Sequence, residues 1–152
     1  MIQRIQSLFL FIVFIAGICL FFLPVAFYSS DMLFCKFNIT GITQINGQPQ
    51  NLPNTIPLII FTIIMTVFPF IIIFLYKNRP LQMKLCRLCI IINVLFIAII
   101  FWYADIIEKN LCVDSIYKTG AFLPLLTLIF LFLANMSIRK DEKIIKSADR
   151  LR

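Results

Sequence analysis

Residues 55–76 read TIPLIIFTIIMTVFPFIIIFLY, a run of 22 residues without a single charge. An α-helix needs about 20 apolar residues to cross the roughly 30 Å hydrocarbon core of a bilayer, because it rises about 1.5 Å per residue. In lipid the backbone polar groups must be paired within the segment, so this length predicts a helix, although isoleucine and phenylalanine suit strands in water. This segment therefore decides the class of fold, which we expect to be a membrane-spanning helical protein.

The composition of the whole chain agrees with this interpretation. Hydrophobic residues make up 61% of the 152 residues and charged residues 14%, against about 45–50% and about 25% in soluble domains. These values exclude a soluble globular domain and a disordered chain. The sequence contains no histidine, which excludes a histidine-based metal site or general base.

Three further uncharged stretches have the length of a span. We predict an all-α integral membrane protein, a single domain over residues 1–152 with four transmembrane helices in an antiparallel bundle, a short β-like outer loop and a helical cytosolic tail. The predicted spans are residues 8–27, 55–76, 88–104 and 119–138; the outer loops are 28–54 and 105–118, the cytosolic loop is 77–87 and the tail is 139–152.

The basic residues indicate the direction of the spans. Eleven of them flank one side of the predicted bundle, namely Arg4, Lys77, Arg79, Lys84, Arg87, Arg139, Lys140, Lys143, Lys146, Arg150 and Arg152. The other side has Lys36, Lys109 and Lys118. The positive-inside rule places the richer side in the cytosol, so we expect both termini there, in a bacterial cytoplasmic (inner) membrane.

The first outer loop carries strand signals. Residues 37–40 and 42–43 alternate apolar and polar side chains, and Asn46-Gly47 favours a tight turn. Pro49 and Pro53 then weaken a returning strand. We expect a short, imperfect β-hairpin over the outer mouth of the bundle.

Cysteines offer the main redox candidates. Cys35 and Cys112 lie in the two predicted outer loops, where an oxidising compartment would allow a disulfide between them, although two separate thiols are an open alternative. Cys86 and Cys89 form a C-x-x-C pair at the cytosolic start of the third span. This pair lacks the βαβ setting of a redox motif and a second cysteine pair for metal, so we interpret it as small residues at a helix interface.

The predicted membrane interior contains no ionisable residue of the kind that ion and proton pathways use. Its polar side chains are mild, among them Thr62, Thr66, Asn93, Thr127 and Asn135. Hydrogen bonds from helix to helix explain them at least as well as a substrate path does. We therefore expect no catalytic, cofactor-binding or metal-binding residues and no enzymatic activity.

The tail after residue 138 has a helical pattern, because Ile138, Ile145, Ala148 and Leu151 recur at spacings of seven, three and three. It either extends the fourth span into the cytosol or lies on the anionic inner leaflet. Its basic residues are candidates for contact with a protein partner or lipid: Arg139, Lys140, Lys143, Lys146, Arg150 and Arg152. Interspersed acids argue against nucleic acid as the ligand.

Both ends of the chain carry a resemblance. Residues 1–7 (MIQRIQS), 139–143 (RKDEK) and 147–152 (SADRLR) resemble a family of small four-span bacterial inner-membrane proteins of unknown function. The resemblance implies a four-helix membrane fold and no known activity, cofactor or catalytic residue.

We expect a non-enzymatic accessory or scaffold subunit that docks a partner in a membrane complex through its basic C-terminal helix. Two alternatives stay open: a membrane thiol redox protein that uses Cys35 and Cys112, and an oligomeric channel or lipid-handling protein. The redox alternative is weakened because membrane thiol–quinone oxidoreductases have a close cysteine pair in each outer loop, and here each loop has one cysteine.

Overall fold

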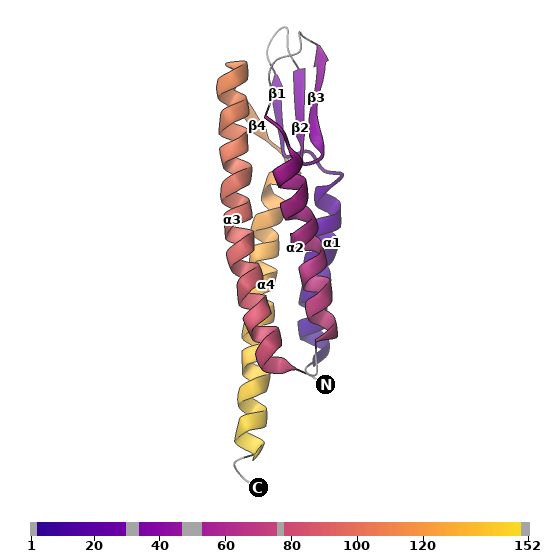
Figure 1. Cartoon of the computed structure of the whole chain (residues 1–152), viewed down its shortest axis with the longest axis vertical. Helices are drawn as coiled ribbons and strands as arrows, with labels where there is room; N and C mark the ends of the chain where they lie inside the picture. Colours follow the sequence, from indigo (N-terminus) through magenta and orange to yellow (C-terminus); the bar gives the residue numbers. More distant parts are fainter. Residues whose placement is uncertain (1–2, 30–33, 47–52, 76–77, 150–152) are drawn as a thin grey trace.

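The computed structural model describes residues 3–29, 34–46, 53–75 and 78–149. Within these residues the chain is mostly helical, with a small antiparallel sheet at one end of a helical bundle (Figure 1). Helix α1 packs against α2 and α4, and α3 packs against the same two helices. The elements in chain order are α1 (Gln3–Leu20), β1 (Ala26–Ser29), β2 (Phe34–Asn38), β3 (Gly41–Asn46), α2 (Ile56–Phe74), α3 (Arg79–Leu111), β4 (Ser115–Tyr117) and α4 (Thr119–Asp149).

Among the described residues, three helices are long and apolar enough to cross a membrane: Ile56–Phe74, Pro80–Leu111 and Thr119–Glu142. They contain the predicted second, third and fourth spans almost completely. The apolar part of α1, Ile5–Leu20, is shorter. The prediction that the first span continues to residue 27 is wrong, because the helix ends at Leu20 and the chain enters the sheet at Ala26.

The end of α1 has a local cause. Pro24 disfavours helical geometry in the residue before it, and the chain that follows is bound to other segments. The Val25 N–H donates to the carbonyl of Phe37 (2.9 Å), and the Val25 carbonyl accepts from the N–H of Lys118 (2.9 Å). From Ala26 onward the apolar chain therefore forms a strand rather than another turn of helix.

The sheet has the strand order β3-β2-β1-β4, with every neighbouring pair antiparallel. The predicted hairpin exists, but its turn lies at Ile39-Thr40 between β2 and β3. The prediction that Asn46-Gly47 forms the turn of this hairpin is therefore wrong. Asn46 ends β3, and Gly47 lies outside the described residues. Strands β1 and β4 were not predicted.

Helices α3 and α4 are longer than the predicted spans. Most of the predicted cytosolic loop belongs to α3, which begins directly after its N-cap Asn78 with a proline in its first turn, where the missing N–H costs nothing. Helix α4 continues without a break from Thr119 to Asp149. The predicted helical tail is confirmed as far as Asp149, in the form that extends the fourth span (Figure 1).

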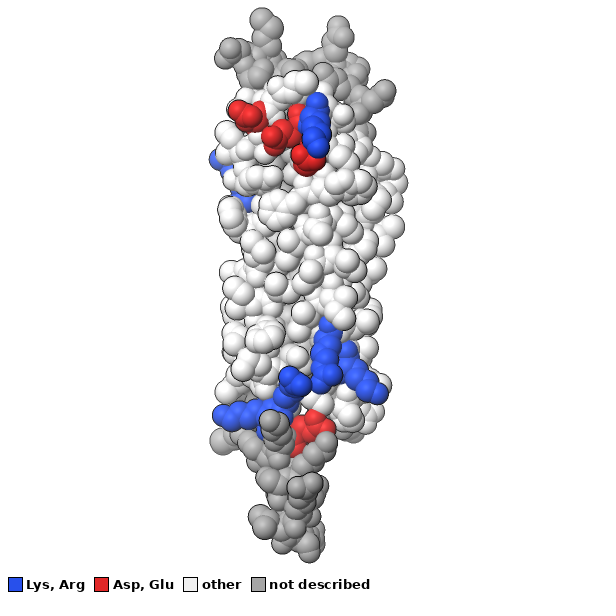
Figure 2. Space-filling model, turned by 90° about the vertical axis from the view of Figure 1, so that its left-hand side faces the viewer, with Lys and Arg blue, Asp and Glu red and all other residues white. Residues whose placement is uncertain are grey.

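The bundle has an apolar interior and an apolar exterior. Leu10, Leu58, Phe96 and Leu131 are buried between the helices. Large apolar side chains also point outward from every helix, for example Leu8, Ile63, Ile91 and Ile129. Figure 2 shows the charged side chains of one face gathered at the two ends, with uncharged residues between them.

Candidate functional site

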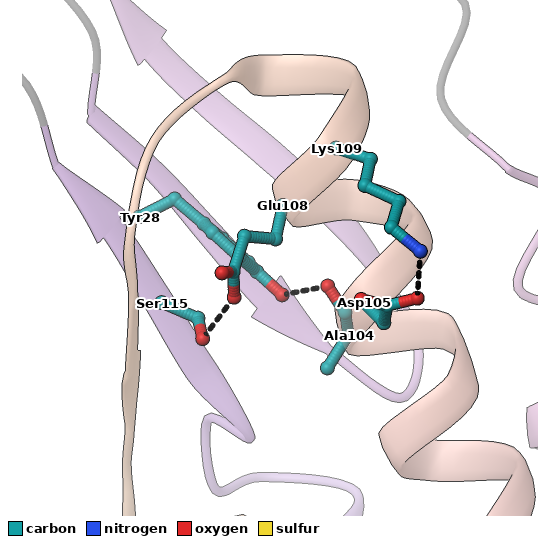
Figure 3. A network of polar contacts seen from close by, with 6 residues as sticks. All are labelled: Tyr28, Ala104, Asp105, Glu108, Lys109 and Ser115. Carbon is teal, nitrogen blue, oxygen red and sulfur yellow. Dashed lines mark hydrogen bonds and ion pairs between the residues drawn. The ribbon is translucent and has the colours of Figure 1, made fainter.

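The sheet end holds a network of polar contacts between β1, β4 and the last turns of α3 (Figure 3). The buried hydroxyl of Tyr28 donates to the carbonyl of Ala104 (3.0 Å), and the Ser115 hydroxyl donates to a carboxylate oxygen of Glu108 (2.5 Å). Lys109 forms an exposed ion pair with Asp105 (2.7 Å). The contacts of Tyr28 and Ser115 fasten the sheet to α3, whereas the ion pair of Lys109 with Asp105 lies within α3.

Burial changes the acid–base properties of two side chains of this sheet. Desolvation is the largest cause that raises the pKa of the Tyr28 hydroxyl, and the nearby Tyr117 and Glu108 raise it further. Desolvation also raises the pKa of the Cys35 thiol. Both groups are therefore held in the neutral form, which makes the Cys35 sulfur a poor nucleophile.

The two cysteines predicted as redox candidates have unlike surroundings. Cys35 is buried in β2, whereas Cys112 is exposed at the C-cap of α3, and both are free thiols in the structure. Cys35 pairs with Tyr28 on β1, and Tyr28 pairs with Ser115 on β4, so two strand spacings of about 4.8 Å separate Cys35 from the start of β4. The structure brings the two thiols to the same end of the molecule, and the disulfide between them stays a prediction.

The C-x-x-C pair lies inside the bundle. Cys86 and Cys89 are fully buried, and the Cys86 thiol donates to the carbonyl of Leu131 on α4 at 3.6 Å. This location agrees with the interpretation as small interface residues. Across the described ranges, no group of three or more cysteine, aspartate or glutamate side chains is arranged to hold a metal ion.

Four of the five polar residues that the sequence places in the interior donate hydrogen bonds to one another or to the backbone, whereas the buried side-chain oxygen of Asn135 has no partner among the described residues. The amide of Asn93 donates to the Thr127 hydroxyl (2.9 Å), which donates to the carbonyl of Pro124 (2.8 Å). Thr62 and Thr66 donate to carbonyls four residues earlier on α2. The predicted hydrogen bonding between helices is thus confirmed for Asn93 and Thr127, whereas Thr62 and Thr66 bond within their own helix.

The opposite end of the bundle contains a contact that the sequence did not reveal. The side-chain amide of Gln6 on α1 donates to the carboxylate of Asp141 on α4, and both side chains are buried. Asp141 follows the buried Ile138 by three residues and so lies on the inward face of α4. That spacing is the one signal in the sequence that could have separated it from the solvated charges of the tail.

Four of the six basic residues of the tail lie within the described structure, which ends at residue 149. Arg139 and Lys140 are exposed where α4 passes the first turns of α1. Lys143 and Lys146 continue the same helix, and Arg150 and Arg152 lie outside the described residues. On α3, Lys84 and Arg87 are also exposed. Figure 2 shows basic side chains gathered at this end of the face in view.

Fold and sites together define a mostly helical protein with outward-facing apolar helices and a small sheet at one end. A protein-family model described as a domain of unknown function (DUF4293) matches residues 2–151, so the chain belongs to that family. The resemblance to an uncharacterised family is thereby confirmed. No curated protein matches the chain.

Proposed function

We propose that this protein is an integral protein of a bacterial cytoplasmic membrane and that all four helices cross the bilayer. The apolar side chains that face outward from every helix support this proposal. In water they would form a large exposed apolar surface, whereas lipid would cover them. Helix α1 has 18 residues and a length of about 27 Å, close to the roughly 30 Å hydrocarbon core. The distribution of basic residues supports cytosolic termini and an external sheet.

Within that membrane, we propose a non-enzymatic role as an accessory or scaffold subunit that docks a partner through the end of α4. The observation that carries this proposal is the uninterrupted course of α4 past its apolar part, from Ile138 to Asp149. Eleven residues beyond Ile138 extend the helix by about 16 Å. A basic helix at that position suits recognition by an acidic or amphipathic protein surface.

The contact between Gln6 and Asp141 decides how this proposal is tested. A deletion that starts at Asp141 would also remove a buried partner of α1 and would disturb the bundle itself. A deletion of residues 143–152 retains Arg139, Lys140, Asp141 and Glu142. We therefore choose that truncation for affinity purification in mild detergent, followed by mass spectrometry of the co-purifying proteins.

The matched control replaces residues 143–152 by a helix-forming polar segment of equal length and equal net charge. We expect a stoichiometric partner with the native protein, and its loss with both the truncated and the replaced tail. Retention of that partner by the replaced tail would show that the tail acts only through its net charge and not through its sequence. Retention by the truncated protein would contradict docking through α4.

A further inference from the structure

An apolar groove lies between α3 and α4 on the surface of the bundle. Its volume is about 350 Å³, which falls at the lower end of the roughly 300–1,000 Å³ that ligand pockets occupy. Its lining atoms are all apolar. The lining residues are Ile90, Val94, Leu128, Ile129, Phe132 and Leu133.

Basic side chains flank one end of this groove. Arg87 precedes Ile90 by three residues, so it lies on the same face of α3, about 4.5 Å along the axis. Arg139 and Lys140 follow Leu133 by six and seven residues, a distance of about 9–10 Å along α4. Because consecutive helices α3 and α4 are antiparallel, residues before Ile90 and residues after Leu133 lie toward the same end of the groove (Figure 1). The contact between Cys86 and Leu131 places Arg87 about level with Leu131, so Arg139 lies about 12 Å further along the axis.

The carboxylate of Asp141, at this end of α4, faces away from the groove. The Asp141 carboxylate is buried against Gln6, on the inward side of α4. Glu142 is partly buried, whereas Arg87, Arg139 and Lys140 are exposed. The groove therefore joins an apolar surface at membrane depth to three cationic side chains at its cytosolic end.

We propose that this groove is a binding site for one anionic phospholipid. An acyl chain lies along the apolar lining, and the phosphate is bound by Arg87 together with Arg139 and Lys140. Guanidinium groups bind phosphate oxygens in a bidentate manner, and basic pockets between helices on the cytosolic side recognise anionic headgroups. This inference rests on the proposed membrane location and is independent of a partner for the tail.

The charge at the groove favours lipid over a second copy of the chain. A twofold interface uses the same patch on both subunits. With the axis along the membrane normal, the basic side chains of both copies would lie at one level and face each other, which like-charge repulsion disfavours. A phosphate placed between Arg87 and Lys140 removes that repulsion.

The test is native mass spectrometry of the full-length protein in mild detergent with added phosphatidylglycerol or phosphatidylcholine. Val94→Trp fills the groove from α3, and Leu133→Trp fills it from α4. Val67→Trp on α2 is the control, because Val67 and Val94 are similarly exposed, at 45% and 50%. We expect the wild type and the control to retain one tightly bound phosphatidylglycerol and both groove variants to lose it.

A second pair of variants tests the headgroup. Arg87→Gln with Lys140→Gln should lower the preference for phosphatidylglycerol over phosphatidylcholine about fivefold for each charge removed. Lys109→Gln with Lys118→Gln removes the same charge at the sheet end and should leave the preference unchanged. An equal effect of both pairs would overturn the proposal, since it would show a nonspecific dependence on net charge.

The remaining outcomes separate the site from the proposed membrane location. A dimer mass that Val94→Trp abolishes, without any change in bound lipid, would assign the groove to a second copy and overturn the lipid site. A protein that resists alkaline carbonate extraction from membranes but shows no preference for phosphatidylglycerol would overturn this inference alone. Release by carbonate would overturn the membrane location together with the site.

Discussion

The side-chain amide of Gln6 donates a hydrogen bond to the carboxylate of Asp141, which joins the second turn of α1 to α4 across 135 positions of sequence. Both side chains are buried at about 5% exposure. Burying a carboxylate without hydrogen-bond donors costs free energy. This contact therefore holds Asp141 of α4 level with Gln6 of α1. The second carboxylate oxygen of Asp141 has no hydrogen-bond partner among the described residues. The stabilisation of this carboxylate therefore depends strongly on the donor from Gln6.

Removal of the Gln6 amide should therefore destabilise the bundle. Gln6→Leu leaves the Asp141 carboxylate without this donor, and we expect a loss of about 1–3 kcal/mol. For a chain of this size that corresponds to a decrease of roughly 2–10 °C in the Tm, measured by differential scanning fluorimetry in detergent.

The control for this prediction is Asn110→Leu, at an exposed position near the sheet end. The double variant Gln6→Leu with Asp141→Leu should recover part of the lost stability, because no buried charge is left behind. Equal Tm values for the wild type and Gln6→Leu would show that the contact does not stabilise the fold.

Helices α1 and α2 approach closely at Gly17. A Cβ atom at this position would lie 2.5 Å from the hydroxyl oxygen of Thr66 and 3.2 Å from its Cα atom. We expect Gly17→Ala to force the helices apart and to cost about 1–3 kcal/mol, visible as a lower Tm. Gly41→Ala is the control, since a Cβ there meets nothing within 4 Å. A neutral Gly17→Ala would contradict the close packing of α1 on α2.

The Tyr28 hydroxyl should make stability depend on alkaline pH. Its pKa is raised above the ordinary value of 10.0, mainly through burial, so the unfolded chain ionises first. The stability that the neutral hydroxyl contributes is complete below that pH and declines as the pH rises above it. Tyr28→Phe also loses the bond to Ala104, worth about 1 kcal/mol, but escapes the alkaline decline.

The measurement is the Tm of wild type and Tyr28→Phe across this pH range. The Tm advantage of the wild type should shrink as the pH rises above 10. An advantage that stays constant would show that the hydroxyl is not protected by the fold.

Thiol labelling tests the orientation and the disulfide together. A membrane-impermeant maleimide applied to intact cells should label Cys112, which is exposed, and leave the buried Cys35 unmodified. Cys112→Ser should abolish the label, and Cys35→Ser should leave it unchanged. Labelling that requires prior reduction in the wild type but not in Cys35→Ser would establish the predicted disulfide, whereas labelling that requires cell lysis would contradict an external sheet.

Much of the fold was predictable because length and hydropathy suffice for long apolar helices. Residues 55–76 are apolar for a full span, and α2 fills that stretch from Ile56 to Phe74. The end of α1 was not predictable from hydropathy, because residues 25–28 are as apolar as the helix before them. Their strand structure depends on hydrogen bonds to Phe37 and Lys118, which are remote in the sequence.

The sites divide in a similar way. The helical course of the tail followed from the spacing of Ile138 and Ile145, which is a local property. The burial of Asp141 depends on Gln6, and a single sequence does not connect residues so far apart. The apolar groove likewise depends on which faces of α3 and α4 meet, a property of packing that composition leaves open.

Site-specific photo-cross-linking measures most directly the central claim, that the end of α4 docks a partner. A photoreactive amino acid replaces Ile145 in the tail or, as the control, the exposed Ile116 of β4 at the opposite end. We predict one discrete adduct with a heterologous protein from position 145 and none of that mass from position 116. Adducts with lipid alone from position 145, or the same adduct from both positions, would contradict docking through the tail.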